Sequence, residues 1–449
     1  MDFDGSAAVG DLMKEMGYRP DQRIWNYWRD YSGEAFDWLL EPANGNVEVI
    51  DMYAKSYDSS KITICTVHWP QPEAYDPAEE FSPTYPAATL TFIPDQGGIL
   101  ELSYQRCLSL GVDFRFATWA KQLVRQDGGR VEGVIVRDLD GNYSRVNAKK
   151  GVIMAAGDYA SNEAMVKYFC GGRAWPTMFT SSDARGAVTN IGEGQCMGAW
   201  IGAKLEDGPH APMTHTLGGA LGVDPYLLLN ADGCRFCNED VAGQQLSSQL
   251  YRQRGNAGWS IFDDDYPDQV ELMGCSHGSV NHILPAEDVP NLAGAVMTIG
   301  RSAVTSRSAV ERSCTTADTV EELAAKLYSD PKAQQNMINA VNRYNELAEA
   351  GEDTDYHKTP KRLFPIKKAP FYATKISAGS MLVCLGGLSV DPDSLNVVDE
   401  SMQPIEGLYA VGNNMGGRIL QDYPVTIAGA SHGTCLTFGY LVGRRCAES

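Results

Sequence analysis

The sequence lacks the features of a membrane protein and of a nucleic-acid-binding protein. No apolar run approaches the length of a transmembrane span, and the opening MDFDGSAAVGDLMKEMG has neither the basic nor the long apolar region of a secretory signal. Lys and Arg number 37 against 57 Asp and Glu, which gives a formal net charge of −20. Because phosphate binding requires a basic surface, this charge argues against nucleic acid as a partner and against docking on anionic membranes.

The cysteines lack the spacing of a metal site or of a disulfide framework. There are 11, an odd number, and they are scattered. This pattern indicates free thiols in a reducing compartment, so we predict a cytoplasmic location. Cys234 and Cys237 form a lone CxxC, with no second pair and no His at zinc or haem-attachment spacing. We interpret both as part of a different motif, with a redox pair as the alternative, and expect no metal site.

A glycine-rich stretch near the C-terminus, residues 407–443, organises the chain. Leu408–Val411 has the pattern of a short buried strand, Gly412–Gly417 has that of a turn, and small residues over 428–433 precede a predicted helix. Leu436, Phe438 and Leu441 form one face of that helix. A glycine turn followed by a helix N-terminus lets backbone N–H groups approach an electron-rich ligand. The stretch therefore predicts a ligand site.

Other segments predict a chain that mixes helices and strands. An apolar segment ends in small residues at Ala155-Ala156-Gly157, which suits a parallel sheet with a ligand at the carboxyl ends of its strands. Residues 41–95 have an irregular pattern. The remaining pattern predicts helices over 21–40 and 98–111, a helical pair over 319–349, strands over 112–116, 121–124 and 131–136, and a hairpin turn at 140–142.

The 407–443 stretch resembles the C-terminal flavin segment of the fumarate reductase / 3-ketosteroid dehydrogenase superfamily of FAD enzymes (FAD-binding-2 type). Tyr423-Pro424, Gly429–Gly433 and Phe438-Gly439-Tyr440 are similar to the "YPG…GATIG…FGY" ending of the ketosteroid dehydrogenases, with a slightly longer loop here. Ala156-Gly157 is similar to part of the superfamily's "ATGG", with Asp158 in place of the second glycine. Tyr226–Glu239 resembles "lvN.dGkRFvnE", which implies a strand, a turn and a return strand that open the capping domain.

The resemblance implies an α/β fold in two domains. It implies an FAD-binding domain with a parallel sheet, formed by residues 1–215 and 373–449, and an inserted α+β capping domain over 216–372. Superfamily members begin with a strand–GxGxxG–helix unit that holds the ADP pyrophosphate. No such unit precedes the helix predicted at 21–40. The sequence therefore looks like a member that lacks its first βαβ unit, and a partner chain that supplies this unit is one expectation.

FAD is the cofactor that the resemblance implies. The GxG at 192–194 has the form of a dinucleotide fingerprint, but no long apolar strand precedes it, and it is closer to the superfamily's "tGdGi" loop beside the flavin. The cofactor-binding residues implied in this way are Ala156, Gly157, Gly192, Gly194, Gly386, Gly387, Gly412, Asn413, Ser431 and Gly433.

The resemblance also implies catalytic residues. Tyr423 and Gly429 occupy the positions of the donors that hydrogen-bond the substrate ketone in ketosteroid dehydrogenases; the alternative for Tyr423 is a packed tyrosine whose hydroxyl caps backbone. Arg418 is the second choice, as a clamp for a carboxylate substrate. Glu239, with Arg235, has two open interpretations: a member of a proton-delivery chain, or an ion pair that staples a hairpin.

One departure separates this sequence from the fumarate reductases. Those enzymes carry a catalytic arginine three residues after an Asp-Asp pair that resembles Asp263-Asp264, and this chain has Pro267 there. The resemblance therefore implies hydride transfer between flavin N5 and an activated C=C bond of an enone or enoate, in either direction. We expect a bacterial reductase of a steroid-like or plant-phenolic substrate, with electrons from a separate carrier because no haem motif is present. The alternative is a truncated, inactive remnant, or a subunit whose partner completes the FAD site.

Overall fold

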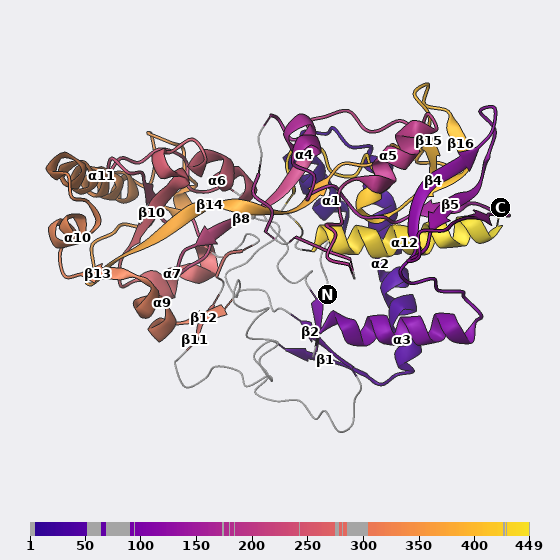
Figure 1. Cartoon of the computed structure of the whole chain (residues 1–449). Coiled ribbons are helices and arrows are strands. Elements are labelled where there is room, and N and C mark those ends of the chain that lie inside the picture. The colour runs from indigo at the N-terminus through magenta and orange to yellow at the C-terminus, as the bar shows by residue number, and fades with distance from the viewer. Residues whose placement is uncertain are drawn as a thin grey trace.

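The computed structural model consists of two groups of elements joined by a long strand (Figure 1). The structure describes residues 5–51, 64–68, 90–93, 95–172, 175–178, 180–183, 185–241, 243–273, 278–280, 282–284, 304–424, 427 and 429–448. Within these residues no helix has the length and apolar character needed to cross a membrane.

A small mixed sheet belongs to the group on the right of Figure 1, where β15 and β16 are labelled at the upper edge. β7 (Val152–Met154) and β16 (Pro404–Ala410) run parallel, with Leu408 opposite Val152, and β15 (Asn396–Val398) is antiparallel to β16. The strands β7 and β16 are stabilised by burial of their apolar side chains. These side chains share one buried cluster with two helices, α2 (Gln22–Leu40) and α12 (Ala430–Glu448). Phe438 and Leu441 belong to that cluster, whereas Leu436, the third residue of the predicted helix face, does not.

Two peripheral sheets and several helices complete this group. The predicted hairpins form the antiparallel order β4-β5-β6, and α5 packs on β4. The segment predicted to be irregular contains the described strands of a second sheet, in the order β1-β2-β3. The bounds are α1 Gly5–Glu15, η1 Glu41–Ala43, β1 Val47–Asp51, β2 Ile64–His68, β3 Leu90–Ile93, α3 Gln96–Ser109, β4 Trp119–Arg125, β5 Val131–Arg137, β6 Tyr143–Asn147, α4 Glu163–Phe169, α5 Glu193–Trp200 and η6 Gly412–Asn414.

A five-stranded sheet forms the centre of the group on the left of Figure 1. Its order is β13-β14-β10-β9, with β8 also paired to β14, and all of these pairings are antiparallel. The predicted helical pair is α10 and α11, which pack on each other and share a core with this sheet. The bounds are β8 Ala211–Gly218, β9 Leu227–Leu229, α6 Gly243–Leu250, η3 Arg254–Asn256, β10 Ala257–Phe262, α7 Tyr266–Met273, β11 His282–Leu284, β12 Val304–Ser306, α9 Arg307–Ser313, β13 Thr315–Ala317, α10 Val320–Leu327, α11 Pro331–Ala350, η5 Pro360–Arg362 and β14 Phe371–Leu385.

β14 links the two groups. Its first residues pair with β10 and β13, and its last residues, through Leu385, pair with β8. Figure 1 shows this strand as the orange arrow between the two groups. The turn Gly386-Gly387 follows directly, so the strand delivers two of the predicted cofactor-binding glycines to the first group.

Two local predictions are wrong. The strand predicted over 112–116 does not form: Val112 donates its N–H to Cys107 at the end of α3, and the rings of Phe114 and Phe116 stack on each other and against Tyr104. The return strand predicted after the turn at 230–234 is reduced to one bridge between Leu229 and Arg235. Residues 112–116 have the alternation of apolar residues, but a strand also needs a neighbouring backbone to pair with.

Candidate functional site

Segments far apart in the sequence meet where β7 and β16 end. The Ala156 N–H donates to Oδ1 of Asn414 over 2.7 Å. Parallel neighbours end at the same edge of a sheet, so the residues after both strands lie together there. Gly194, in the first turn of α5, packs so closely on Asn414 that a Cβ at the glycine would lie 2.3 Å from Oδ1. The structure thus brings together three of the predicted cofactor-binding segments.

Gln195 connects these segments to a fourth. This side chain is 1% exposed and follows Gly194 in α5. Sequence reasoning did not single it out, because one glutamine beside a glycine carries no motif. Its Nε2 lies within hydrogen-bonding distance of the backbone oxygens of Gly157 (3.1 Å), Gly386 (3.4 Å) and Asn413 (3.4 Å).

Several predicted glycines are required by contacts within the protein. A Cβ at Gly386 would lie 2.0 Å from Nδ1 of His210, and one at Gly387 would lie 2.2 Å from the Asn414 carbonyl oxygen. Gly192 has φ +89° and lies against Met165. These glycines allow the backbone segments to approach one another, which is a packing role that their sequence motifs did not reveal.

Other glycines have more open surroundings. Gly412 has φ +58°, and its nearest neighbour on the side of a Cβ is Cys435 Sγ at 3.6 Å. Gly429 is exposed, has φ +75°, and has no neighbour within 4 Å of a Cβ position. A Cβ at Gly157 (φ +81°) would lie 3.1 Å from Asn190 Oδ1, and one at Gly433 would lie 3.0 Å from Trp28 Nε1. Gly412 and Gly429 therefore leave the most room for a ligand beside the backbone.

Tyr423 caps the start of α12. Its hydroxyl oxygen accepts a hydrogen bond of 3.0 Å from the N–H of Ser431, in the first turn of that helix. The side chain is 2% exposed, and this burial raises the pKa of the phenol to about 12. No acceptor for the hydroxyl hydrogen lies among the described residues. The capping geometry of the alternative interpretation is thus present, and the hydroxyl still has its proton to donate.

Arg418 is buried beneath the same turn. Its guanidinium donates to the carbonyl oxygens of Gly412 (2.6 Å) and Met415 (3.3 Å), to Oδ1 of Asn413 (3.3 Å) and to the Thr434 hydroxyl. These bonds fix the turn that follows β16 on the first turns of α12. Arg418 therefore acts on the protein's own backbone in this structure.

Glu206 was not predicted and is central to the site. Its two carboxylate oxygens accept hydrogen bonds from the N–H groups of Gly387 (2.8 Å) and Gly417 (2.6 Å). Burial raises the pKa of the carboxyl to about 7. The carboxylate joins the turn after β14 to the turn after β16. A lone glutamate outside any motif gives no sequence signal for such a role.

Two buried polar atoms at this junction lack a hydrogen-bond partner among the described residues. They are Oε1 of Gln195 and Nδ2 of Asn414, on side chains that are 1% and 0% exposed. An unpartnered buried acceptor and an unpartnered buried donor are costly unless a ligand pairs with them. A flavin and its ribityl chain carry both kinds of group. With the open backbone at Gly412 and Gly429, these residues fit FAD.

Arg235 and Glu239 do not join this site. Arg235 makes bidentate ion pairs with Glu239 (2.7 Å) and Asp353 (2.7 Å), and its guanidinium lies over the rings of Tyr344 and Tyr356. All of these partners belong to the group of elements around α11. The geometry is that of the staple in the second interpretation. The proton-delivery role has no support from these contacts.

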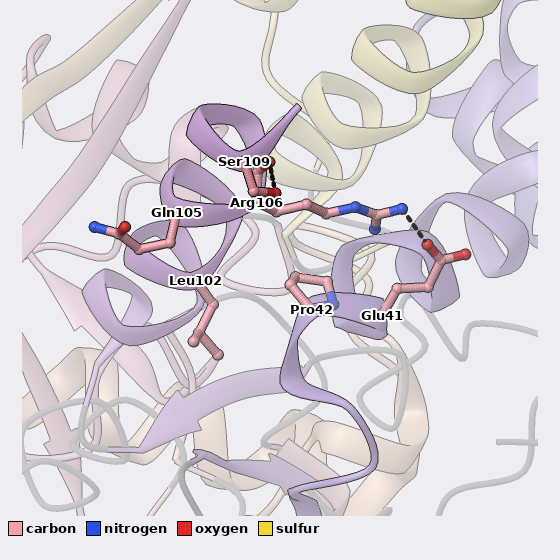
Figure 2. A pocket seen from close by; sticks show the side chains of 6 residues that line it. All are labelled: Glu41, Pro42, Leu102, Gln105, Arg106 and Ser109. Atoms are coloured by element: carbon pink, nitrogen blue, oxygen red, sulfur yellow. Dashed lines mark hydrogen bonds and ion pairs between the residues drawn. The ribbon is translucent and has the colours of Figure 1, made fainter. Parts of the chain in front are cut away.

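A surface pocket lies apart from all predicted site residues. It is lined by Glu41, Pro42, Leu102, Gln105, Arg106 and Ser109, between η1 and α3, and has a volume of about 430 Å³. Figure 2 shows Arg106 reaching across it to Glu41, with 2.6 Å between the charged groups. The described residues contain no group of His, Cys, Asp and Glu side chains that could hold a metal ion.

Comparisons with known proteins identify the family. The family model described as FAD binding domain matches residues 3–421. The chain is 25% identical to a vinyl phenol reductase of Lactiplantibacillus plantarum, over 98% of this chain and 83% of that protein. It is 26% identical to a fumarate reductase (cytochrome) of Shewanella frigidimarina, over 78% of this chain and 54% of that protein. The chain therefore spans only about half the length of the latter relative.

A solved structure has the same fold. It is the 3-ketosteroid-delta4-(5alpha)-dehydrogenase of Rhodococcus jostii, in complex with 4-androstene-3,17-dione, with a TM-score of 0.61 at 19% identity over 99% of this chain and 83% of that one. This likeness concerns the fold alone. Since the family model covers most of the sequence, and the residues at the junction of β7 and β16 fit the flavin, this chain belongs to the FAD binding domain family and its cofactor is FAD.

Proposed function

We propose that this protein is an FAD-dependent oxidoreductase that transfers a hydride between the flavin and an activated C=C bond of a small molecule. The observation that carries the proposal is the junction at the ends of β7 and β16. There the segments of Ala156, Gly194, Gly387 and Asn413 surround two polar atoms that have no partner in the described part of the chain. The relatives support the reaction class: their names are reductases and a dehydrogenase, acting at CH–CH bonds.

The chain's own residues have separable tasks toward the cofactor. FAD, when bound, supplies the site that accepts or donates the hydride. Gly412 and Asn413 would lie beside its ring, and the first turn of α12, with Ser431 and Gly433, would turn the positive end of the helix dipole toward it. Asn414 and Gln195 would pair with its polar edge. Glu206 and Arg418 would keep the two turns in place.

Tyr423 and Gly429 are the proposed donors to the substrate. Hydride addition to an enone builds negative charge on the carbonyl oxygen, and a phenol O–H together with a backbone N–H stabilises that charge. The hydrogen bond from Ser431 to the phenol oxygen polarises the O–H bond. Because the pKa of Tyr423 is raised to about 12, the group keeps its proton at neutral pH. The hydroxyl lies at the N–H of Ser431, two residues after the exposed Gly429, which supports this assignment.

We infer that the substrate is an uncharged conjugated carbonyl compound or phenol and not a dicarboxylate such as fumarate. Pro267 lies in the first turn of α7, where the fumarate reductases carry an arginine, and Asp264 beside it accepts a 3.0 Å hydrogen bond from the Tyr372 hydroxyl. Arg418, the second candidate for a carboxylate clamp, is buried and bonded to backbone. Neither position presents a guanidinium that is free for a second carboxylate.

The division into domains is part of the proposal. Residues 1–215 and 373–449 would form the FAD-binding domain, and residues 216–372 a cap over the substrate. The two groups of elements joined by β14 support this division (Figure 1). A separate electron carrier and a cytoplasmic location remain predictions.

One observation favours the alternative, a protein that needs another chain segment to complete its FAD site. β7 is an edge strand of its sheet among the described residues, and Ile153 in it is 39% exposed. Val112, Phe114 and Phe116, which were predicted to form a strand, are 46%, 39% and 72% exposed. An added βαβ unit, from a partner chain or from residues upstream, would cover apolar surface of this kind.

The test is a spectrum followed by an assay. The purified protein, incubated with FAD and passed through gel filtration, should show flavin absorbance, at well below one flavin per chain. It should then oxidise reduced methyl viologen when given 4-vinylphenol or 4-androstene-3,17-dione, and fail to do so with fumarate. Turnover of fumarate alone would contradict the inferred substrate. A flavin-free protein with no turnover would contradict the enzyme and favour the alternative.

A further inference from the structure

A buried pair of thiols lies directly before the Gly386-Gly387 turn. Cys384 is the penultimate residue of β14, and Cys170 caps the C-terminal end of α4. Their Sγ atoms are 3.1 Å apart, the separation of a thiol–thiol hydrogen bond, although the residues are 214 positions apart in the sequence. Cys170 is 6% exposed and Cys384 is 0% exposed.

The backbone holds both thiols in place. The Cys384 N–H donates to Oδ2 of Asp158 over 2.8 Å, and the Cys170 N–H donates to the Val166 carbonyl over 2.8 Å. Both side chains belong to one buried cluster with Tyr159 and Met381. The short distance between the sulfur atoms is therefore set by packed elements on both sides.

A proton path leads away from Cys170. The Tyr159 hydroxyl lies 4.0 Å from Cys170 Sγ and is hydrogen-bonded to Nδ1 of His210. The other ring nitrogen, Nε2, lies 2.9 Å from the Glu206 carbonyl oxygen. A carbonyl oxygen only accepts, so Nε2 carries the ring hydrogen and Nδ1 accepts the phenol hydrogen. His210 is thus a neutral base, linked to the thiol through Tyr159.

Packing fixes the orientation of that base. The His210 ring stacks on Phe169, with 4.6 Å between the ring centroids and an interplanar angle of 2°. The backbone N–H of His210 also donates to the Phe169 carbonyl over 2.7 Å. Burial lowers the pKa of the imidazole, so the ring is neutral in the resting protein and its Nδ1 lone pair faces the Tyr159 hydroxyl.

We propose that Cys170 and Cys384 are a redox-modification site, which a small peroxide converts to an intramolecular disulfide. Cys170 gives its proton through Tyr159 to His210, and its thiolate attacks one oxygen of hydrogen peroxide. The O–O bond breaks, Cys170 becomes a sulfenic acid, and the hydroxide that leaves takes up the proton as water. The Cys384 sulfur then attacks the Cys170 sulfur, the S–S bond forms, the S–O bond breaks, and a second water leaves. Two thiols and one peroxide yield one disulfide and two waters.

The two thiols differ in a way that fits this order. The hydrogen bond from Cys384 lowers the pKa of Cys170, whereas burial raises the pKa of Cys384. The thiolate is the attacking form, so Cys170 reacts first and Cys384 resolves the sulfenic acid. The disulfide would tie the end of β14 to α4. The inference stands on this cluster alone and holds with or without bound flavin.

The test maps disulfides in the protein after a hydrogen peroxide titration. Free thiols are alkylated, the protein is digested without reductant, and linked peptides are identified by mass. We expect a Cys170–Cys384 linked pair, two hydrogens lighter than the sum of its free peptides and restored to thiols by dithiothreitol. Exposed Cys234 should react without forming such a link. Recovery of Cys170 and Cys384 as free thiols, or as separately oxidised peptides, would overturn the proposal.

Separate substitutions test the thiol pair and the proton path from Cys170 to His210. Cys170→Ser should abolish the linked peptide, whereas Cys237→Ser, which removes a similarly buried thiol elsewhere, should keep it. Tyr159→Phe removes the proton path and should slow disulfide formation by at least about tenfold. Tyr251→Phe, a change in the same cluster, should leave the rate unchanged. Equal rates for the two tyrosine variants would contradict the path, and the mapping of the parent protein decides the site even where a variant fails to fold.

Discussion

Ala156 and Asn414 are 258 positions apart in the sequence, and the N–H of the first donates to Oδ1 of the second over 2.7 Å. The bond joins the segments that follow β7 and β16 at one edge of the sheet. Asn414 is completely buried, and its Nδ2 has no partner among the described residues. The side chain thus holds the two strand ends together through one atom and offers the other to a ligand.

Asn414→Ala should cost both stability and flavin. The change leaves the Ala156 N–H unpaired and opens a cavity, which should lower the free energy of unfolding by about 1–3 kcal/mol. Flavin per chain after gel filtration should fall with it, because the donor to the cofactor is lost. The matched control is Asn345→Ala in α11, where the side chain bridges to the backbone of Ile366 at 2.6 and 2.9 Å. That variant should lose similar stability and keep the parent's flavin content.

Gly412→Val should remove the flavin without unfolding the protein. The residue has φ +58° and faces Cys435 Sγ at 3.6 Å, so a side chain would fill the space beside the backbone. The positive φ adds strain of roughly 1–2 kcal/mol. Gly351→Val controls for that strain, because Gly351 has φ +70° at the end of α11, with no neighbour within 4 Å. Circular dichroism should show both variants folded, and only Gly412→Val should lose flavin absorbance; equal flavin content in the two would remove Gly412 from the site.

Tyr423→Phe should slow turnover while the protein stays folded. The change removes one donor to the developing oxyanion, which typically costs roughly a hundred- to a thousandfold in kcat. It also removes the acceptor for the Ser431 N–H, at about 1 kcal/mol of stability. Tyr328→Phe is the control, because that hydroxyl donates to the Asn230 carbonyl over 2.9 Å, outside the site. A fall of less than severalfold in kcat for Tyr423→Phe would leave the residue as a helix cap only.

Much of the fold could be predicted from the sequence, because the segments that determine it are continuous stretches with a clear pattern. The apolar runs of β7 and β16, the glycine turn and the helix face with Phe438 and Leu441 all lie in continuous stretches. The strand at 112–116 failed for a non-local reason. Its alternation of Val112, Phe114 and Phe116 satisfies the periodicity of a strand, but periodicity does not reveal whether a neighbouring backbone is available.

The site was predicted only where residues belong to a recognisable motif. Gly412 and Tyr423 lie in such a motif: Gly412 follows β16, and Tyr423 caps the start of α12. Glu206, Gln195 and His210 were missed, because each acts through a contact with a segment distant in sequence. Burial changes the chemistry of such residues, and a single sequence gives no measure of burial.

The raised pKa of Glu206 predicts that this residue's contribution to stability falls as the pH rises. Burial raises the folded-state pKa of this carboxyl to about 7, above its ordinary value of 4.5. Between these values the folded chain binds more protons than the unfolded chain does, so the free energy of unfolding decreases with pH, by up to about 3 kcal/mol across the window. Glu206→Gln should flatten the slope measured by urea unfolding between pH 4.5 and 7.

A control addresses the other carboxyls. Asp21 caps α2, and its hydrogen bond with Arg23 lowers the pKa of the carboxyl below its usual value of 3.8. That contribution is present above the unfolded-state pKa and is lost only as the pH falls below it. Asp21→Asn should therefore keep the parent's slope over the same window. Equal slopes in the parent and in Glu206→Gln would show that Glu206 is ionised in the folded protein throughout this window.

The chain by itself should hold FAD weakly and should associate. The contacts to the flavin ring come from residues such as Gly412 and Asn414, whereas no pyrophosphate-binding strand–turn–helix unit was recognised in the sequence. Half a site binds weakly, because the cost of immobilising the ligand is unchanged while the favourable contacts are fewer. The open edge of β7 and the exposed rings of Phe114 and Phe116 favour contact between chains.

Two measurements check this expectation. Flavin per chain after gel filtration should be well below one for this chain, and should rise for a chain lengthened upstream or mixed with a partner that supplies the unit. Light scattering should show association that Phe116→Glu reduces. Tyr168→Glu is the control, since Tyr168 is 80% exposed on α4, against 72% for Phe116, and should leave association unchanged. Stoichiometric, tightly held FAD in the present chain would contradict the prediction, because residues already here would then be binding the pyrophosphate.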